Sequence, residues 1–131
     1  MRDRAPDGVG GERREARRRA YRSGRRAEAW CAWWLRLCGY RILARRHRSR
    51  HGEIDIVARR GKVVAFVEVK TRPDRGRALA VVRAAQRRRI ERAASAFLAS
   101  RPELGEHAVR FDVIAVVRWR WPHHVADAWR P

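Results

Sequence analysis

Two short apolar runs on either side of a glycine turn constrain the fold of this chain more than any other feature. Apart from one Asp and one Glu, residues 54–58 and 63–69 consist of Ile, Val, Ala and Phe, and Arg-Arg-Gly-Lys lies between them. Branched and aromatic runs separated by a short turn that contains Gly predict a β-hairpin. The chain must therefore build a sheet around these two strands.

The charged residues of this hairpin fall on one face. A turn centred on Arg60 and Gly61 places Glu53 opposite Glu68. Side chains alternate between the two faces of a strand. One face then carries the charged residues Glu53, Asp55, Glu68 and Lys70. The other face carries the apolar residues Ile54, Ile56, Ala65, Val67 and Val69. Buried like charges are unfavourable unless a partner compensates for them, and a divalent cation is one such partner.

The carboxylates of the hairpin predict a site for Mg²⁺ or Mn²⁺. Mg²⁺ is usually held by one or two carboxylates together with water and substrate phosphate. Asp55 and Glu68 supply carboxylate oxygens, and the backbone carbonyl of Val69 is a third candidate ligand. Lys70 shares the face of Glu68 and would position an attacking water or stabilise the transition state. The alternative is a simple Glu68–Lys70 ion pair on a half-exposed sheet.

The rarity of lysine favours the metal site over the simple ion pair. The chain has 33 Lys and Arg residues, and only Lys62 and Lys70 are lysines. Arg has replaced Lys nearly everywhere, yet a compact ammonium stands two residues from Glu68. The two side chains differ most where a small, reorientable charge must fit a tight site.

The overall charge predicts a polyanionic partner. The chain has 131 residues, 45% of them hydrophobic, a formal net charge of +19 and a pI near 11.8. This length fits one domain, which we place at residues 12–131 after a disordered basic arm at residues 1–11. A strong positive charge points to nucleic acid, with DNA as the first expectation. We expect phosphate contacts from Arg45, Arg46, Arg48, Arg50, Arg87 and Arg88.

The two cysteines and the absence of long apolar runs predict a cytoplasmic protein. Cys31 and Cys38 lie on one face of an expected helix, where their geometry argues against a shared disulfide and their number argues against a zinc site. No segment reads as a signal peptide or approaches the ~20 apolar residues that cross a bilayer. The sequence leaves open whether the chain forms a homodimer.

The pattern of elements predicts an α/β fold with helices on both sides of a mixed sheet. In chain order, we expect a helix over 12–38, a strand over 40–44, a basic loop over 45–51, the hairpin, a link over 71–76, a helix over 79–100, a strand over 111–117 and a short strand near residue 125. Glu28 lies on the apolar stripe of the first helix. It is either adjacent to the metal or paired with an arginine on the helix surface.

Several other polar and aromatic residues have a structural interpretation. We expect Asp112 to be a strand-end or capping residue. His123 and His124 are adjacent and point different ways in an extended chain, so they are not a metal-binding pair. The tryptophans are mainly core residues, although Trp33 or Trp119 stacking on an unpaired base is an alternative. The sequence leaves open the roles of Glu53, Gln86, His123 and His124.

The hairpin also carries a family resemblance. Gly52-Glu53-Ile54-Asp55 followed by Phe66-Val67-Glu68-Val69-Lys70-Thr71-Arg72 resembles the signature of the YraN-like family of small bacterial proteins. The likeness extends over residues 24–129 and includes the runs at 39–43, 110–114 and 123–129. It implies membership of the restriction-endonuclease-like superfamily, with an α/β/α core similar to that of archaeal Holliday-junction resolvases. Carried over residue by residue, the resemblance implies catalytic roles for Glu28, Asp55, Glu68 and Lys70.

The leading functional hypothesis is a metal-dependent nuclease that hydrolyses phosphodiester bonds in DNA, with branched or structured DNA as the expected substrate. A rival from another class is a non-catalytic nucleic-acid-binding module that keeps the nuclease fold and uses its arginines on phosphate. A third is a scaffold within a repair or uptake assembly. Complete Asp55, Glu68 and Lys70 favour the enzyme, because a pure binder gains nothing from acids that face a polyanion.

Overall fold

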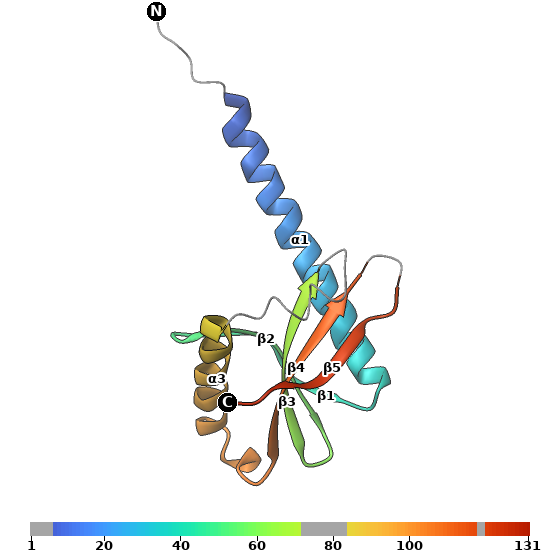
Figure 1. Ribbon diagram of the computed structural model, residues 1–131, viewed down its shortest axis with the longest axis vertical. Helices are drawn as coiled ribbons and strands as arrows, with labels where there is room; N and C mark the ends of the chain where they lie inside the picture. Colours follow the sequence, from blue (N-terminus) through green and yellow to red (C-terminus); the bar gives the residue numbers. More distant parts are fainter. Residues whose placement is uncertain (1–6, 72–83, 118–119) are drawn as a thin grey trace, which may run out of the picture.

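The structure, a computed structural model, describes residues 7–71, 84–117 and 120–131 (Figure 1). Its elements in chain order are α1 (Asp7–Leu37), β1 (Arg41–Ser49), β2 (Gly52–Arg60), β3 (Val63–Thr71), α3 (Ala84–Ala99), the 3-10 helix η1 (Pro102–Leu104), β4 (Ala108–Val116) and β5 (His123–Trp129). The predicted α/β class, with a mixed sheet flanked by helices, is confirmed. The predicted order of helices and strands is confirmed as well.

The five strands lie in the sheet in the order in which they occur in the chain. All neighbouring strands are antiparallel except β3 and β4, which are parallel. Parallel neighbours need a crossover connection, and α3 lies in the segment between them. The strand that carries Glu68 and Lys70 is therefore the central strand of the sheet.

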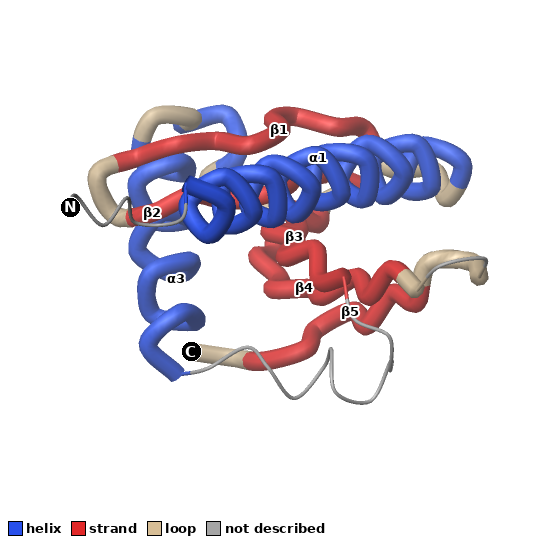
Figure 2. The backbone as a smooth tube through the Cα atoms, turned by 90° about the horizontal axis from the view of Figure 1, so that it is seen from above, coloured by secondary structure: helices blue, strands red, loops and turns tan. Residues whose placement is uncertain are grey.

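Two apolar clusters fill the two faces of the sheet. The cluster with α3 contains Phe66, Ile90, Phe97 and Phe111, and the cluster with α1 contains Cys31, Leu35, Ile56 and Val67. Each side chain of this kind contributes ~1.5–3 kcal/mol when it is fully buried. Seen from above, α1 and α3 run in clearly different directions over the sheet (Figure 2).

Helix α1 begins at Asp7, so residues 7–11 of the expected basic arm are helical, and the division into an arm and one domain stays a prediction. The N-terminal part of the helix projects away from the sheet (Figure 1). The helix ends where Gly39 adopts a φ of 89° and the Tyr40 amide donates to the Leu35 carbonyl. This is the usual helix stop at a left-handed glycine. Among the described residues, no helix has the length and apolarity to cross a membrane.

Strand β1 corrects the expectation of a basic loop at residues 45–51. The strand continues to Ser49, with Arg45 paired to Ile56 and His47 paired to Ile54. A run of arginines indicates a loop only where no neighbouring strand forms hydrogen bonds with the segment. Here β1 is an edge strand, and edge strands accept charged side chains because one side stays in water.

The turn of the hairpin is one residue further along the chain than expected. Arg60 pairs with Val63 and Ile56 pairs with Val67, so the loop consists of Gly61 and Lys62. Gly61 has a φ of 60°, which suits a two-residue hairpin turn. The expected pairing of Glu53 with Glu68 is therefore wrong.

The predicted division of the apolar residues between the two faces is wrong at one position. Ile54 packs in the α3 cluster with Phe66, whereas Ile56 packs in the α1 cluster with Val67. The β2–β3 ladder ends at Ile56. Beyond this point β2 pairs with β1 alone, where His47 opposes Ile54, and Ile54 packs in the α3 cluster.

The second helix is described from Ala84 to Ala99. The expected link at 71–76 and the first five residues of the predicted helix fall largely outside the described residues. Strand β4 begins three residues before the predicted strand, and β5 extends over His123–Trp129 where a short strand near residue 125 was expected.

Candidate functional site

Five elements meet around one polar cavity of about 430 Å³. It is lined by Gly24, Arg25 and Glu28 from α1, Arg46 from β1, Glu53 and Asp55 from β2, Glu68, Val69 and Thr71 from β3, and Gln86 from α3. Three of the four predicted catalytic residues line this cavity, together with the third predicted metal ligand. The fourth, Lys70, contacts the rim through Glu68.

Asp55 and Glu68 form a carboxyl pair in which Glu68 is buried and Asp55 is half-buried. The Val69 amide donates to Asp55 Oδ2 at 2.8 Å, and the Asp55 and Glu68 side chains share a hydrogen bond. Burial, followed by the charge of Asp55, raises the pKa of Glu68 to about 8. Burial is also the main cause that raises the pKa of Asp55. At neutral pH the pair therefore holds a proton, and its negative charge is incompletely compensated by the protein.

Lys70 and Gln86 extend this pair toward α3. Lys70 Nζ lies 3.3 Å from Glu68 Oε1 and donates to Gln86 Oε1 at 3.3 Å. Gln86 Nε2 in turn donates to the same Glu68 oxygen at 2.9 Å. The amide thus bridges the acid and the ammonium and limits how far either can move. Gln86 lies four residues before the buried Ile90 and therefore on the inward face of its helix, which is the signal in the sequence that its polar group has a buried partner.

Glu28 is buried and paired at the same time. Arg45 Nε donates to Glu28 Oε1 at 2.8 Å, and Arg46 Nε lies 3.2 Å from Glu28 Oε2. Glu28 therefore lines the cavity and pairs with arginines of β1 rather than on the helix surface, and its place next to a metal stays a prediction. Its charge reaches Cys31, whose pKa is raised to about 12 by burial and then by Asp55 and Glu28.

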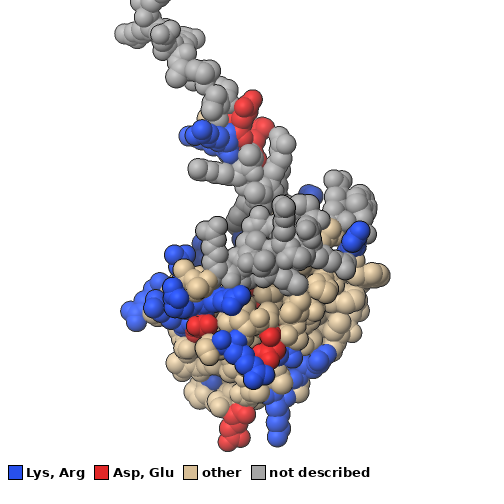
Figure 3. Space-filling model, in the orientation of Figure 1, with Lys and Arg blue, Asp and Glu red and all other residues tan. Residues whose placement is uncertain are grey.

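The arginines predicted to bind phosphate lie in two places. Arg45, Arg46 and Arg48 lie beside the cavity, and Arg48 Nε is 3.5 Å from Glu53 Oε2. Arg50 is exposed at the β1–β2 turn and Arg88 is exposed on α3. Figure 3 shows basic side chains on the side where Figure 1 places this turn and the upper end of α3. Arg87 instead stacks over the Trp129 ring at 5.6 Å.

The donor set suits a hard divalent cation. Asp55 and Glu68 offer two carboxylates, which is the number that Mg²⁺ usually takes from a protein, and Val69 lines the same cavity. A raised pKa in a pair of acids marks negative charge that a cation would stabilise. Among the described residues, no group of three or more His, Cys, Asp or Glu side chains is arranged to hold a metal ion.

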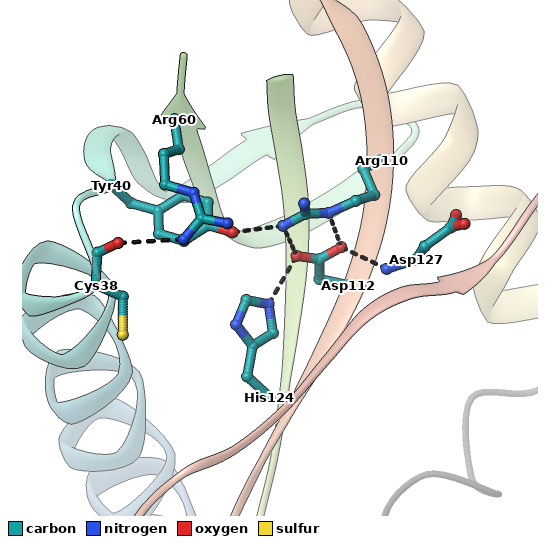
Figure 4. A network of polar contacts seen from close by, with 7 residues as sticks. All are labelled: Cys38, Tyr40, Arg60, Arg110, Asp112, His124 and Asp127. Carbon is teal, nitrogen blue, oxygen red and sulfur yellow. Dashed lines mark hydrogen bonds and ion pairs between the residues drawn. The ribbon is translucent and has the colours of Figure 1, made fainter. Parts of the chain in front are cut away.

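Asp112 corrects a sequence prediction. It lies in the middle of β4, fully buried, and accepts hydrogen bonds from Arg110 Nε at 2.8 Å and Arg110 Nη2 at 2.7 Å (Figure 4). His124 Nε2 lies 2.7 Å from it, and the Asp127 amide donates at 3.0 Å. Burial alone would raise the pKa of Asp112, but these hydrogen bonds lower it. The strand-end interpretation missed a network whose partners come from distant segments.

The same network extends to the start of β1. Arg110 Nη2 donates to the Tyr40 hydroxyl at 2.6 Å, and the Arg60 guanidinium lies 4.5 Å from the centre of the Tyr40 ring. Arg60 also donates to the Cys38 carbonyl at 3.2 Å (Figure 4). His124 is thereby assigned a structural role, since it contacts a buried carboxylate away from the cavity.

Comparison with known proteins places this architecture in a family. The profile of a family described as "Uncharacterised protein family UPF0102" matches residues 27–116, which include the hairpin and most of the cavity. The chain belongs to the UPF0102 family. The YraN-like resemblance of its motifs is confirmed at this level.

Relatives within the UPF0102 family cover nearly the whole chain. A UPF0102 protein of Paramagnetospirillum magneticum is 53% identical over 119 residues, which are 88% of this chain and 92% of the relative. One of Mesorhizobium japonicum is 50% identical over 113 residues, or 86% and 90% of the two chains. One of Chelativorans is 48% identical over 119 residues, or 91% and 96%. None of these names states an activity.

Proposed function

We propose that this UPF0102 protein is a Mg²⁺- or Mn²⁺-dependent nuclease that hydrolyses phosphodiester bonds in DNA, with branched or structured DNA as its substrate. The observation that carries the proposal is the convergence of Asp55, Glu68 and Lys70 at one arginine-flanked cavity. The resemblance of the motifs to the restriction-endonuclease-like superfamily supports the same activity.

The residues of the cavity divide the work of phosphodiester hydrolysis. Asp55 and Glu68 would hold the cation, because both have oxygens in the cavity and a charge that lacks full compensation. When bound, the cation supplies Lewis-acid polarisation of the phosphate and a more acidic water. Lys70 stabilises negative charge that develops on the phosphate, and Gln86 keeps its ammonium beside Glu68.

The arginines beside the cavity would position the DNA. Arg46 and Arg48 share Glu53 at 3.8 Å and 3.5 Å, so both guanidinium groups lie beside a residue that lines the cavity. A phosphate is a strong competitor for such guanidinium groups. Phosphate contacts fix the position of a nucleic acid without reading its sequence, so binding should be blind to sequence.

The proposal is tested by cleavage assays on linear, flapped and four-way DNA with Mg²⁺, with Mn²⁺ and with EDTA. The two lysines of the chain provide a matched pair of variants, since Lys70 lies at the site and Lys62 is exposed in the hairpin turn. Lys70→Ala should lose about 10²- to 10³-fold in rate, and Lys62→Ala should keep the rate of the wild type. Lys70→Arg should not restore cleavage if the site needs a compact charge.

Asp55→Asn separates catalysis from binding. The variant removes a negative charge that faces the phosphate, so it should bind DNA at least as tightly as the wild type while cleavage is lost. If wild type cleaves none of these substrates with either metal but still binds them, the chain is a binding module rather than a nuclease. Full activity of Lys70→Arg would show that the rarity of lysine is no sign of catalysis.

A further inference from the structure

Three tryptophans form a stack on the outside of α1. Trp33 stacks on Trp30 with ring centroids 5.2 Å apart and an interplanar angle of 18°. Trp30 stacks in turn on Trp121, from the segment before β5, at 6.0 Å and 21°. We call this near-parallel arrangement of Trp33, Trp30 and Trp121 the tryptophan ladder. Helix α1 and a segment far along the chain build it together.

Both end rings of the tryptophan ladder are exposed to an unusual degree. Trp33 is 47% exposed and Trp121 is 63% exposed, whereas Trp129 in the core is 7% exposed. Leu37, on the last turn of the same helix, is 60% exposed. Exposure of a large aromatic side chain to water is unfavourable. A cluster of such side chains marks an interaction surface more often than scattered single residues do.

The tryptophan ladder is separate from the cavity. Successive residues of an α-helix are about 100° apart around its axis. Trp30 and Trp33 are therefore on the other side of α1 from Glu28, which faces the cavity. Whatever the ladder binds would lie along α1 on the side away from the carboxyl pair.

On α1 between Gly24 and Leu37, the exposed charges beside the tryptophan ladder are positive. From Gly24 to Leu37 the exposed charged residues of α1 are Arg25, Arg26 and Arg36, and the one acid in this stretch is buried. Arg26 is four residues before Trp30 and Arg36 is three residues after Trp33, so both are neighbours of the ladder on the helix surface. Arg120 is exposed beside Trp121.

A partner that complements this surface must be anionic and must offer flat rings. Unpaired nucleotides meet both requirements, because a phosphate follows each base and every base has a face that stacks on an indole. Duplex DNA has the same charge, but its bases are stacked inside the helix. An acidic protein would match the arginines but not the parallel rings at stacking distance.

We infer that the tryptophan ladder is a second nucleic-acid site, which binds the unpaired bases of a single strand by stacking on Trp33. The arginines beside it hold the phosphates of the same strand. This inference shares with the proposed function the expectation of a nucleic-acid partner, but it requires neither a metal nor cleavage. For a nuclease of structured DNA, the site would select substrates that carry a single-stranded segment in addition to the part that enters the cavity.

The test is binding in EDTA, where no cleavage occurs, of a labelled oligothymidylate and of a labelled duplex of matched length. Fluorescence anisotropy would be measured for wild type, Trp33→Ala, Trp33→Phe and Leu37→Ala. Trp33→Ala should weaken binding of the single strand about tenfold, within the range that base stacking on one aromatic side chain provides. Binding of the duplex should stay the same. Trp33→Phe should recover most of the loss, because it restores an aromatic face.

The Leu37→Ala variant is the matched control, since it also removes an exposed apolar side chain from α1 but offers no ring. Unchanged affinity of Trp33→Ala for the single strand would overturn the inference, and so would equal losses on single strand and duplex. Sedimentation of the same proteins measures their oligomeric state and tests whether a second copy of the chain occupies the ladder. If wild type is a dimer that Trp33→Ala dissociates, the ladder is an interface between two copies of the chain. Cleavage of duplex by wild type bears only on the proposed nuclease, so the two ideas fail independently.

Discussion

Two buried acidic sites lie on adjacent central strands of this sheet and have opposite electrostatics. Asp112 pairs in register with Val67, the residue before Glu68, and the two acids are 0% and 8% exposed. Asp112 is surrounded by Arg110, His124 and the Asp127 amide, and its pKa is lowered. Glu68 faces Asp55 as well as Lys70, and its pKa is raised to about 8.

The difference separates an acid whose charge is compensated within the fold from a pair of acids that, in the proposed function, binds a cation. Burial costs both groups hydration, but the protein supplies full compensation only for Asp112. At Asp55 and Glu68 the protein brings two like charges together, and neighbouring groups offset only part of the free energy lost through burial and repulsion. Such an arrangement persists when a function requires it, because groups with perturbed pKa values in a cavity are typical of reactive sites.

The largest effect should follow from breaking the compensated site. Asp112→Asn leaves Arg110 and His124 without their anionic partner, and it should lower the free energy of unfolding by about 3 to 5 kcal/mol. Urea denaturation would measure the loss. Asp127→Asn is the control, because its side chain is 38% exposed and pairs with Arg130 on the surface. A loss no greater than that of the control would show that the network of Figure 4 does not stabilise the fold.

The carboxyl pair should instead lower the free energy of unfolding as the pH rises. In metal-free buffer, folded Glu68 keeps its proton to about pH 8, whereas the unfolded chain releases it near 4.5. Between these values unfolding releases a proton, so stability is greatest below the unfolded pKa and is lost as the pH rises through the folded pKa. By pH 7 the loss should reach about 3 kcal/mol, at ~1.4 kcal/mol for each pH unit above the unfolded pKa. Glu68→Gln should remove this slope, and a wild type with a flat profile over this range would contradict the raised pKa.

A divalent cation should reverse that weakness at one site and leave the other untouched. Mn²⁺ at about a hundred times its dissociation constant should stabilise wild type by ~2–3 kcal/mol, because it binds the native state. The same shift should occur in a folded Asp112→Asn protein and be absent in Glu68→Gln. Calorimetry with and without Mn²⁺ measures it. Equal shifts in wild type and Glu68→Gln would place the cation elsewhere.

The smallest effect on stability should come from the arginines at the mouth of the cavity. The Arg48 side chain is 74% exposed, so Arg48→Ala should change the free energy of unfolding by less than about 0.5 kcal/mol. Its DNA affinity should fall, and the salt dependence of binding should decrease by about one unit of slope, as expected for a phosphate contact. Arg130→Ala is the matched control, because Arg130 is also a surface arginine with an acidic partner and lies in another region. Equal losses of affinity would show that net charge matters and position does not.

Local patterns predicted most of the elements of this fold. The hairpin, both helices and the strand that contains Asp112 were predicted from apolar runs, helical periodicity and glycine turns. Errors arose where a neighbour decides the conformation. The arginine-rich segment after Ala44 reads as a loop, and becomes a strand because β2 pairs with it. The turn lies one residue later than expected, because Gly61 accepts the positive φ of a two-residue turn. Arg60 before it stays in the strand.

The sequence predicted which residues belong to the candidate site, but not which of them contact one another. Asp55, Glu68 and Lys70 were placed on one face by the alternation of a strand. The turn lies one residue later than expected, which shifts each cross-strand partner by two positions and leaves this alternation unchanged. Gln86 was left without a role, because its place on the inward face of its helix does not tell that its amide reaches Glu68. Asp112 was misread for the same reason, because its partners come from positions up to 15 residues away.

The sequence by itself determined the chemistry of this protein. Its acids, its lone lysine in the motif and its excess of arginine are written in the order of residues, and local periodicity turns them into faces of strands and helices. Only the tertiary structure decided which charges are compensated. The pKa of an acid depends on hydration and on the charges within a few ångströms of it, and packing sets both. Folding therefore made Asp112 a stabilising acid, whereas the negative charge of Asp55 and Glu68 is only partly compensated by neighbouring groups.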